Sequence, residues 1–133
     1  MRAVALALVV LAAAASVAAS DCAESSTERT VTMRFSRFEP AAATVPAGVA
    51  VTFTLRNDDP IEHEWIVGTD DVHARHRTGT EPYHDEIPTE VTVPALSSRV
   101  TTVTFEHAGL YRYVCHLPGH EAYGMVGTVR VVE

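Results

Sequence analysis

The chain has 133 residues, a formal net charge of -7 and ten basic residues, all of them Arg. These Arg residues are scattered and outnumbered by 17 carboxylates, which excludes the clustered basic surface of a nucleic-acid-binding protein. A chain of this length can bury a single core without a framework of disulfides, and it contains only two Cys residues.

The N-terminus has the pattern of a secretory signal peptide. Arg2 precedes an unbroken run of small and apolar residues at 3–15, which is too short to cross a bilayer comfortably. We therefore expect an exported protein that is periplasmic, held in the cell envelope or secreted. The expected organisation is a signal peptide at 1–20, a flexible tether at 21–29 and one domain at 30–133.

Cys22 offers two alternatives near the start of the mature chain. It could form a disulfide with Cys115, as is common in exported proteins, or it could carry a lipid anchor. We expect neither. Chain termini are usually loose, and the Asp21 that precedes Cys22 fits a lipidation signal poorly.

Alternating apolar residues predict the first strands. Residues 30–35 place Val31, Met33 and Phe35 on one face, as a half-buried strand requires. Residues 49–56 alternate more cleanly than any other segment, so we expect a strand there as well.

The next strand is predicted at residues 63–67, after a break in the pattern. Here His63 shares a face with Trp65 and Val67, so an imidazole lies at the end of an apolar row. A lone His in this position is usually solvated, and only the residues near the C-terminus make it a candidate ligand.

The segment 69–89 interrupts the strands. Thr69 and the two Asp residues after it can cap a short helix at 72–77. His73 and His76 would share one side of this helix, and with His84 they could form a second metal site. We prefer a solvated surface insertion, because no spacing fixes His84 relative to the helix.

Four further strands complete the predicted all-β fold, a Greek-key β-sandwich of about seven strands with a short helical insertion. They are expected at residues 90–93, 98–105, 110–115 and 125–132.

The most informative stretch is the loop that carries Cys115, His120 and Met125. A thiolate, an imidazole and a thioether are the soft and borderline donors that suit copper. Four residues separate each ligand from the next. With His63 as the second imidazole, the set predicts one type 1 copper ion per chain.

The same stretch resembles the cupredoxins, the type 1 blue copper proteins that include plastocyanin and azurin. The shared pattern is Gly109-x-Tyr111-x-Tyr113-x-Cys115, followed by His120 and by Gly124-Met125-Val126-Gly127, and the likeness covers about 31–132. The resemblance implies copper at one end of the sandwich. Its ligands would be Nδ1 of His63, Sγ of Cys115, Nδ1 of His120 and, more weakly, Sδ of Met125.

The chain departs from the family pattern in three ways. The ligand loop is longer than in typical plastocyanins, and the insertion at 69–89 has no counterpart. Glu64 follows His63 where plastocyanin and azurin usually carry an Asn that ties the ligand loops together, so Asn57 is a candidate for that support. An oxidase is not expected, because Val114 takes the flank of Cys115 where the multicopper oxidases have a second His.

We expect a protein that is not an enzyme and that carries single electrons between redox partner proteins of the cell envelope. It would be a monomer, with neither a nucleic-acid partner nor a membrane span. His120 would be the electron exit, within an apolar rim of Leu117, Pro118, Ala122 and Met125. A basic partner would be steered by acidic side chains of this chain, which are Asp58, Asp59, Glu62 and Glu64. The alternative is a copper carrier or buffer that delivers or sequesters the metal, and a metal-free adhesive domain is a third reading.

Overall fold

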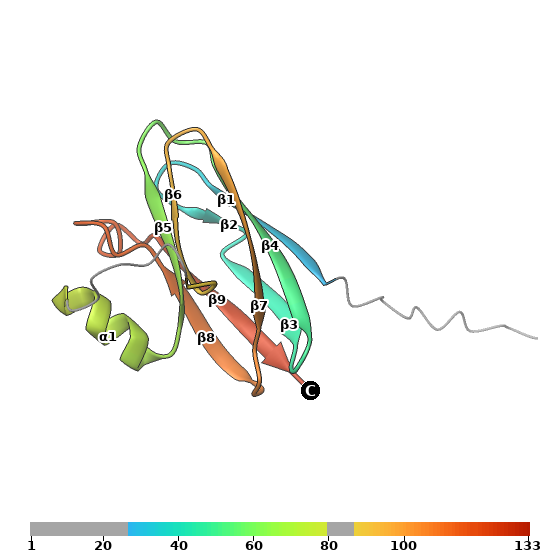
Figure 1. The fold of residues 1–133 in the computed structure, drawn as a ribbon. Helices are drawn as coiled ribbons and strands as arrows, with labels where there is room; N and C mark the ends of the chain where they lie inside the picture. The colour runs from blue at the N-terminus through green and yellow to red at the C-terminus, as the bar shows by residue number, and fades with distance from the viewer. Residues whose placement is uncertain (1–26, 80–86) are drawn as a thin grey trace, which may run out of the picture.

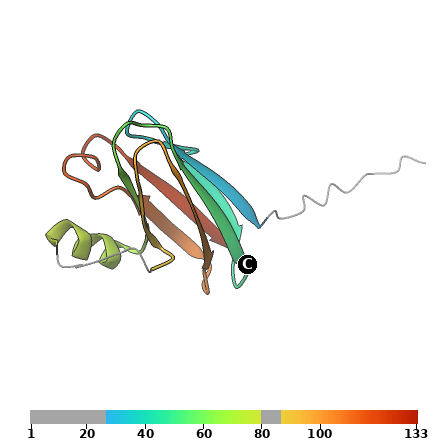
Figure 2. The same cartoon turned by 45° about the horizontal axis from the view of Figure 1, so that its top comes forward.

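The computed structural model of the protein describes residues 27–79 and 87–133. Within these residues two β-sheets pack face to face, and one helix lies outside them (Figures 1 and 2). The elements are β1 (Glu28–Met33), β2 (Phe38–Glu39), β3 (Ala42–Pro46), β4 (Ala50–Asn57), β5 (His63–Gly68), α1 (Asp70–Thr78), β6 (Glu90–Val93), β7 (Ser98–Thr104), β8 (Gly109–Val114) and β9 (Val126–Val132).

The two sheets have the strand orders β2-β1-β4-β7 and β3-β9-β8-β5-β6. β1 pairs with β4 and β3 pairs with β9 in parallel, whereas the other neighbours are antiparallel. Strands that follow one another in the chain therefore often lie in different sheets, and the predicted β-sandwich is confirmed.

The described residues contain nine strands rather than about seven. The two extra strands, β2 and β3, are short. β2 has only two residues, and β3 is rich in Ala and ends on Pro46, so neither shows the β-branched alternation that indicates a strand. β3 is an edge strand paired only with β9 in its sheet, a position in which Pro is tolerated.

The prediction that Phe35 lies on the buried face with Val31 and Met33 is wrong. β1 ends at Met33, and the chain then turns back through Phe35, which has a φ of 54° and is 75% exposed. The N–H groups of Phe35 and Ser36 donate to the carboxylate of Asp59 at 2.7 and 2.8 Å. This long-range hydrogen bonding overrides the alternation.

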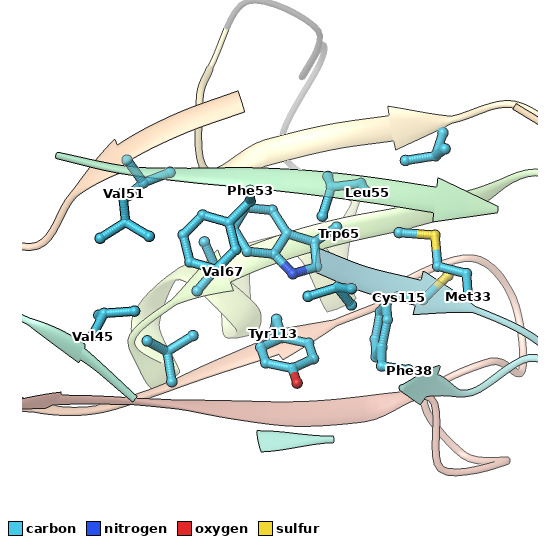
Figure 3. Close-up of a cluster of buried hydrophobic side chains, with 14 of the residues drawn as sticks. Met33, Phe38, Val45, Val51, Phe53, Leu55, Trp65, Val67, Tyr113 and Cys115 are labelled. Carbon is cyan, nitrogen blue, oxygen red and sulfur yellow. The ribbon is translucent and has the colours of Figure 1, made fainter. Parts of the chain in front are cut away.

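The core lies between the sheets and includes the side chain of Cys115. Phe53 and Trp65 pack with ring centroids 4.9 Å apart, and both are fully buried. Figure 3 shows Cys115 in this cluster, beside Met33 and Phe38. Burying each large apolar side chain stabilises the fold by about 1.5–3 kcal/mol, so the thiol is attached to a rigid framework.

The predicted helix is confirmed as α1, which begins after Thr69 and ends at Gly79, a residue with a φ of 68°. α1 lies against β5 on the outer face of the sandwich (Figure 1). Most described residues of the insertion are exposed, as a surface insertion requires, but its two His side chains are not solvated, because His73 is fully buried and His76 is 8% exposed. His84 and Cys22 lie outside the described residues. No helix in residues 27–79 or 87–133 is long and apolar enough to cross a membrane.

Candidate metal centre

Three of the four predicted ligands meet at one end of the sandwich. Nδ1 of His63, at the start of β5, is 3.2 Å from Nδ1 of His120. Sγ of Cys115, just after β8, is 3.3 Å from the same nitrogen, and all three ligand atoms lie within 4.8 Å of one another. His63 and Cys115 are fully buried, whereas His120 is half-buried.

The fourth predicted ligand, Met125, lies beside Cys115 and His120, to which its backbone is hydrogen-bonded. Its N–H donates to the carbonyl of His120 at 3.0 Å, and its carbonyl accepts the N–H of Cys115 at 3.2 Å. The side chain is fully buried, so Met125 does not belong to the exposed apolar rim, contrary to expectation.

The ligand loop, residues 115–125, is folded into compact turns. The N–H of His120 donates to the carbonyl of Leu117 at 3.0 Å, and the N–H of Gly124 donates to the carbonyl of Glu121 at 2.9 Å. Gly119 and Gly124 have φ values of 86° and 89°, in the left-handed region that a residue with a side chain rarely adopts. These turns return the chain to the site after Cys115.

Glu64 ties the two ligand-bearing segments together. Its backbone N–H donates to Sγ of Cys115 at 3.4 Å, and its carboxylate accepts the N–H of His116 at 3.2 Å. A Glu at this position therefore makes the link between β5 and the ligand loop that the sequence left in doubt.

Asn57 supports the other side of the site. Its buried side-chain amide donates to the carbonyls of Ile61, Val93 and Pro94 at 2.7, 3.1 and 3.0 Å. These bonds brace the loop that leads into His63 against the end of β6. Asn57 thus holds His63 in place, while Glu64 makes the contact with Cys115.

Asp59 is the functional residue that sequence reasoning placed wrongly. It was expected on an acidic surface, but it is 7% exposed and accepts a hydrogen bond from Nε2 of His63 at 2.8 Å. Burial alone would raise the pKa of Asp59, but hydrogen bonds from Ser36, His63 and Phe35 outweigh it and leave the pKa below its usual value. An ionised carboxylate only accepts, so Nε2 of His63 carries a proton and Nδ1 presents its lone pair to the site.

Burial controls protonation at the other two ligands. It raises the pKa of Cys115 to about 11, against the smaller opposing effect of the Glu64 N–H, and it lowers the pKa of His120. Without metal the thiol is therefore neutral near pH 7, as is the His120 imidazole. The nearby His63 ring adds to the lowering at His120.

The surface beside His120 is only partly as expected. Pro118 and Ala122 are exposed and Leu117 is half-buried, as a rim requires. Tyr123, which the sequence did not single out, is 71% exposed and adds the largest apolar surface to this rim. Of the four acidic residues expected to steer a partner, Asp58 and Glu62 are exposed and Glu64 is half-buried.

The residues present fit type 1 copper. Two imidazole nitrogens and a thiol sulfur converge from separate segments, with a thioether-bearing residue alongside. The N–N separation of 3.2 Å suits two nitrogens bound to one ion at about 2.0 Å each. Structural zinc usually takes four Cys or His donors, whereas a set of two His, one Cys and a weak Met is typical of blue copper.

Comparisons with known proteins agree with this site. The family model described as Cupredoxin-like domain matches residues 3–129. The copper-resistant cuproprotein CopI of Rubrivivax gelatinosus is 36% identical over 108 residues, which cover 79% of this chain and 66% of that protein. The copper-resistant cuproprotein CopI of Pseudomonas aeruginosa is 28% identical over 127 residues, covering 71% of this chain and 70% of that protein.

Among solved structures, auracyanin B superposes with a TM-score of 0.65 at 26% identity, covering 80% of this chain and 88% of that one. The sandwich fold is therefore shared with a known protein. The chain spans slightly less than two thirds of the Rubrivivax relative's length, so that relative has additional sequence outside the match.

Proposed function

We propose that this chain, which belongs to the cupredoxin family, binds one copper ion through His63, Cys115, His120 and Met125 and sequesters or delivers copper outside the cytoplasm. The observation that carries the proposal is the convergence of two imidazole nitrogens and a thiol sulfur within 4.8 Å. Two relatives similar to this chain are named copper-resistant cuproproteins, which favours copper handling over electron transfer as the main task.

The protein's own groups prepare the site for copper. Asp59 holds the His63 ring so that Nδ1 faces inward, and Glu64 places a donor against the sulfur of Cys115. Bound copper would supply a Cu(I)/Cu(II) couple, and the thiolate and thioether favour Cu(I). His120 is the half-buried member of the set, so exchange with solvent or a partner would take place on its side.

The proposal includes export, with residues 1–20 as the signal peptide and 30–133 as the copper-binding domain. The predicted strand starting at 30 begins two residues earlier, at Glu28. Proteins of the compartments outside the cytoplasm meet copper before the cell interior does, so a buffer placed there limits entry of the metal.

Copper tolerance tests the proposed task. The chain, its Cys115→Ser variant and a control variant, His107→Gln, would each be produced in a copper-sensitive bacterium. His107 is exposed and is not one of the proposed ligands. We expect the unaltered chain and the control to raise the copper concentration that stops growth, and Cys115→Ser to lose this effect. Equal tolerance with and without the chain would contradict copper handling.

Electron transfer is the second candidate, favoured by the auracyanin-like fold and by the apolar rim around His120. A substitution at Tyr123 distinguishes copper handling from electron transfer, because Tyr123 is exposed on the rim and is not among the proposed ligands. Under copper handling, Tyr123→Ser leaves copper tolerance unchanged. Under electron transfer, it slows electron exchange with a small haem protein, measured by stopped-flow absorbance.

A further inference from the structure

A second pair of imidazoles meets where α1 packs against the start of the ligand loop, away from the proposed copper site. Nδ1 of His73, on α1, lies 3.0 Å from Nε2 of His116. His116 follows Cys115 directly, just beyond the end of β8, and its side chain lies towards α1 while Cys115 belongs to the buried core. Neither side chain is used by the proposed copper site, which involves only the backbone N–H of His116.

A carbonyl lies behind the His73 ring and a carboxylate behind the His116 ring, and the two remaining nitrogens face each other. Nε2 of His73 is 3.2 Å from the carbonyl of Arg112, which can only accept, so that nitrogen carries the proton and Nδ1 carries the lone pair. Nδ1 of His116 is 3.6 Å from the carboxylate of Glu121. Metal-binding imidazoles almost always have such a carbonyl or carboxylate at the nitrogen away from the metal.

The arrangement repeats the geometry of the copper site. There, Nδ1 of His63 faces Nδ1 of His120 at 3.2 Å, and Asp59 accepts the proton on the far nitrogen of His63. The two pairs therefore have similar separations of the facing nitrogens, 3.0 and 3.2 Å, and each has an acceptor behind one ring.

The pair is held by packed elements, and a surface pocket reaches one of its two rings. His73 is fully buried, and the His116 side chain is 5% exposed. Two hydrogen bonds from Arg77 to Glu121, at 2.9 and 2.6 Å, fasten α1 to the ligand loop. A pocket of about 250 Å³, lined by His116 and Glu121 among others, reaches the His116 ring from outside and has room for water molecules.

We propose that His73 and His116 form a second metal site for a divalent transition-metal ion. Neutral imidazole nitrogens bind Cu(II) more tightly than the other first-row divalent ions, so Cu(II) is the expected occupant and water completes its coordination. Binding requires the proton on Nε2 of His116 to move to Nδ1, on the side of the Glu121 carboxylate 3.6 Å away, so the ring stays neutral and no proton leaves the protein.

His76 lines this site rather than binding the metal. Its ring stacks on His116 with centroids 5.4 Å apart, its Nδ1 lies 2.8 Å from the carbonyl of Val72 and its Nε2 lies 3.4 Å from Glu90. The inference extends the proposed function, since one chain would hold two copper ions at consecutive residues, but it does not depend on that function.

Copper titration of the purified full chain tests the site. We expect two tightly bound Cu(II) ions per chain by metal analysis. One produces the thiolate-to-copper absorption band, and the other adds an electron paramagnetic resonance signal with nitrogen hyperfine splitting but no further thiolate absorption. His73→Gln and His116→Gln should each bind one ion and keep the band, whereas the control His107→Gln should bind two.

A wild-type chain that binds one copper ion overturns the second site, as does a second ion that persists in both variants. Near-ultraviolet circular dichroism identifies a variant that has not folded. In that case the number of copper ions bound by the wild type and by the other variant decides whether the second site exists. Failure of the first site is separately visible, because it removes the absorption band without removing the nitrogen-split signal.

Discussion

The backbone N–H of Glu64 donates to Sγ of Cys115 at 3.4 Å, across the gap between β5 and the ligand loop. The Glu64 carboxylate adds a second link by accepting the N–H of His116 at 3.2 Å. Glu64 therefore holds the Cys115 sulfur directly, through its backbone N–H, and holds the next residue of the ligand loop through its carboxylate.

Removing the Glu64 carboxylate should loosen the copper site. In Glu64→Ala the His116 N–H loses its acceptor, and we expect copper affinity to fall by about 10–100-fold with a shift of the thiolate-to-copper band. Glu64→Gln keeps an accepting oxygen and should stay close to wild type. Chelator competition and visible spectra measure both effects, and a Glu64→Ala protein that matches wild type in both would contradict this role.

Asp59 should matter for stability even in the metal-free protein. In Asp59→Ala, the Nε2–H of His63 and the N–H groups of Phe35 and Ser36 lose their common acceptor. We expect a loss of about 2–4 kcal/mol in the free energy of unfolding, measured with urea.

The neighbouring Asp58 is the matched control for that change. It forms a surface ion pair with Arg56 at 2.9 Å, and both side chains are well exposed to solvent. Such pairs contribute about 0–1 kcal/mol, so Asp58→Ala should cost little. Equal losses for the two alanine variants would show that the carboxylate of Asp59 has no special part.

Gly127 should not tolerate a side chain. A Cβ at this position would overlap the ring of Tyr113, which is fully buried and donates its hydroxyl to the carbonyl of Pro40 at 2.6 Å. We expect Gly127→Ala to destabilise the protein by about 1–3 kcal/mol. At Gly109 an added Cβ would lie 3.8 Å from the Tyr111 ring, an ordinary contact, so Gly109→Ala should be much milder in the same unfolding assay.

Copper affinity should rise with pH. Burial raises the pKa of Cys115 to about 11, so near neutrality the thiol must lose its proton before the sulfur can bind metal. Protons therefore compete with the metal for the sulfur, and this competition weakens as the pH rises. Cu(I) affinity should increase by about tenfold per pH unit below the thiol pKa. Chelator competition at several pH values measures the slope, and a flat profile would mean that the thiol is already ionised.

The sequence predicted the parts of the site that depend on residue type and local spacing. The donors Cys115 and His120 lie on one loop, and alternation along β5 placed His63 on the buried face with Trp65. The supports of the site depend on contacts between distant segments. Asp59 binds the turn at Phe35, and Glu64 reaches His116, so neither contact has a local signal.

The errors have the same origin. Alternation along β1 predicted a buried Phe35, but the hydrogen bonds to Asp59 turn the chain before that residue. Alternation along the predicted strand at 110–115, continued by one residue, correctly placed His116 on the side away from Cys115. It could not show that α1 packs there and brings His73 to 3.0 Å from His116.

The most direct test of the account is Cu(II) addition to the purified chain and to Cys115→Ser, followed by visible absorption. An intense blue or green thiolate-to-copper band in the wild type, absent from the variant, is the predicted result. Copper bound without such a band, or a band of equal strength in Cys115→Ser, would contradict a type 1 site at His63, Cys115, His120 and Met125.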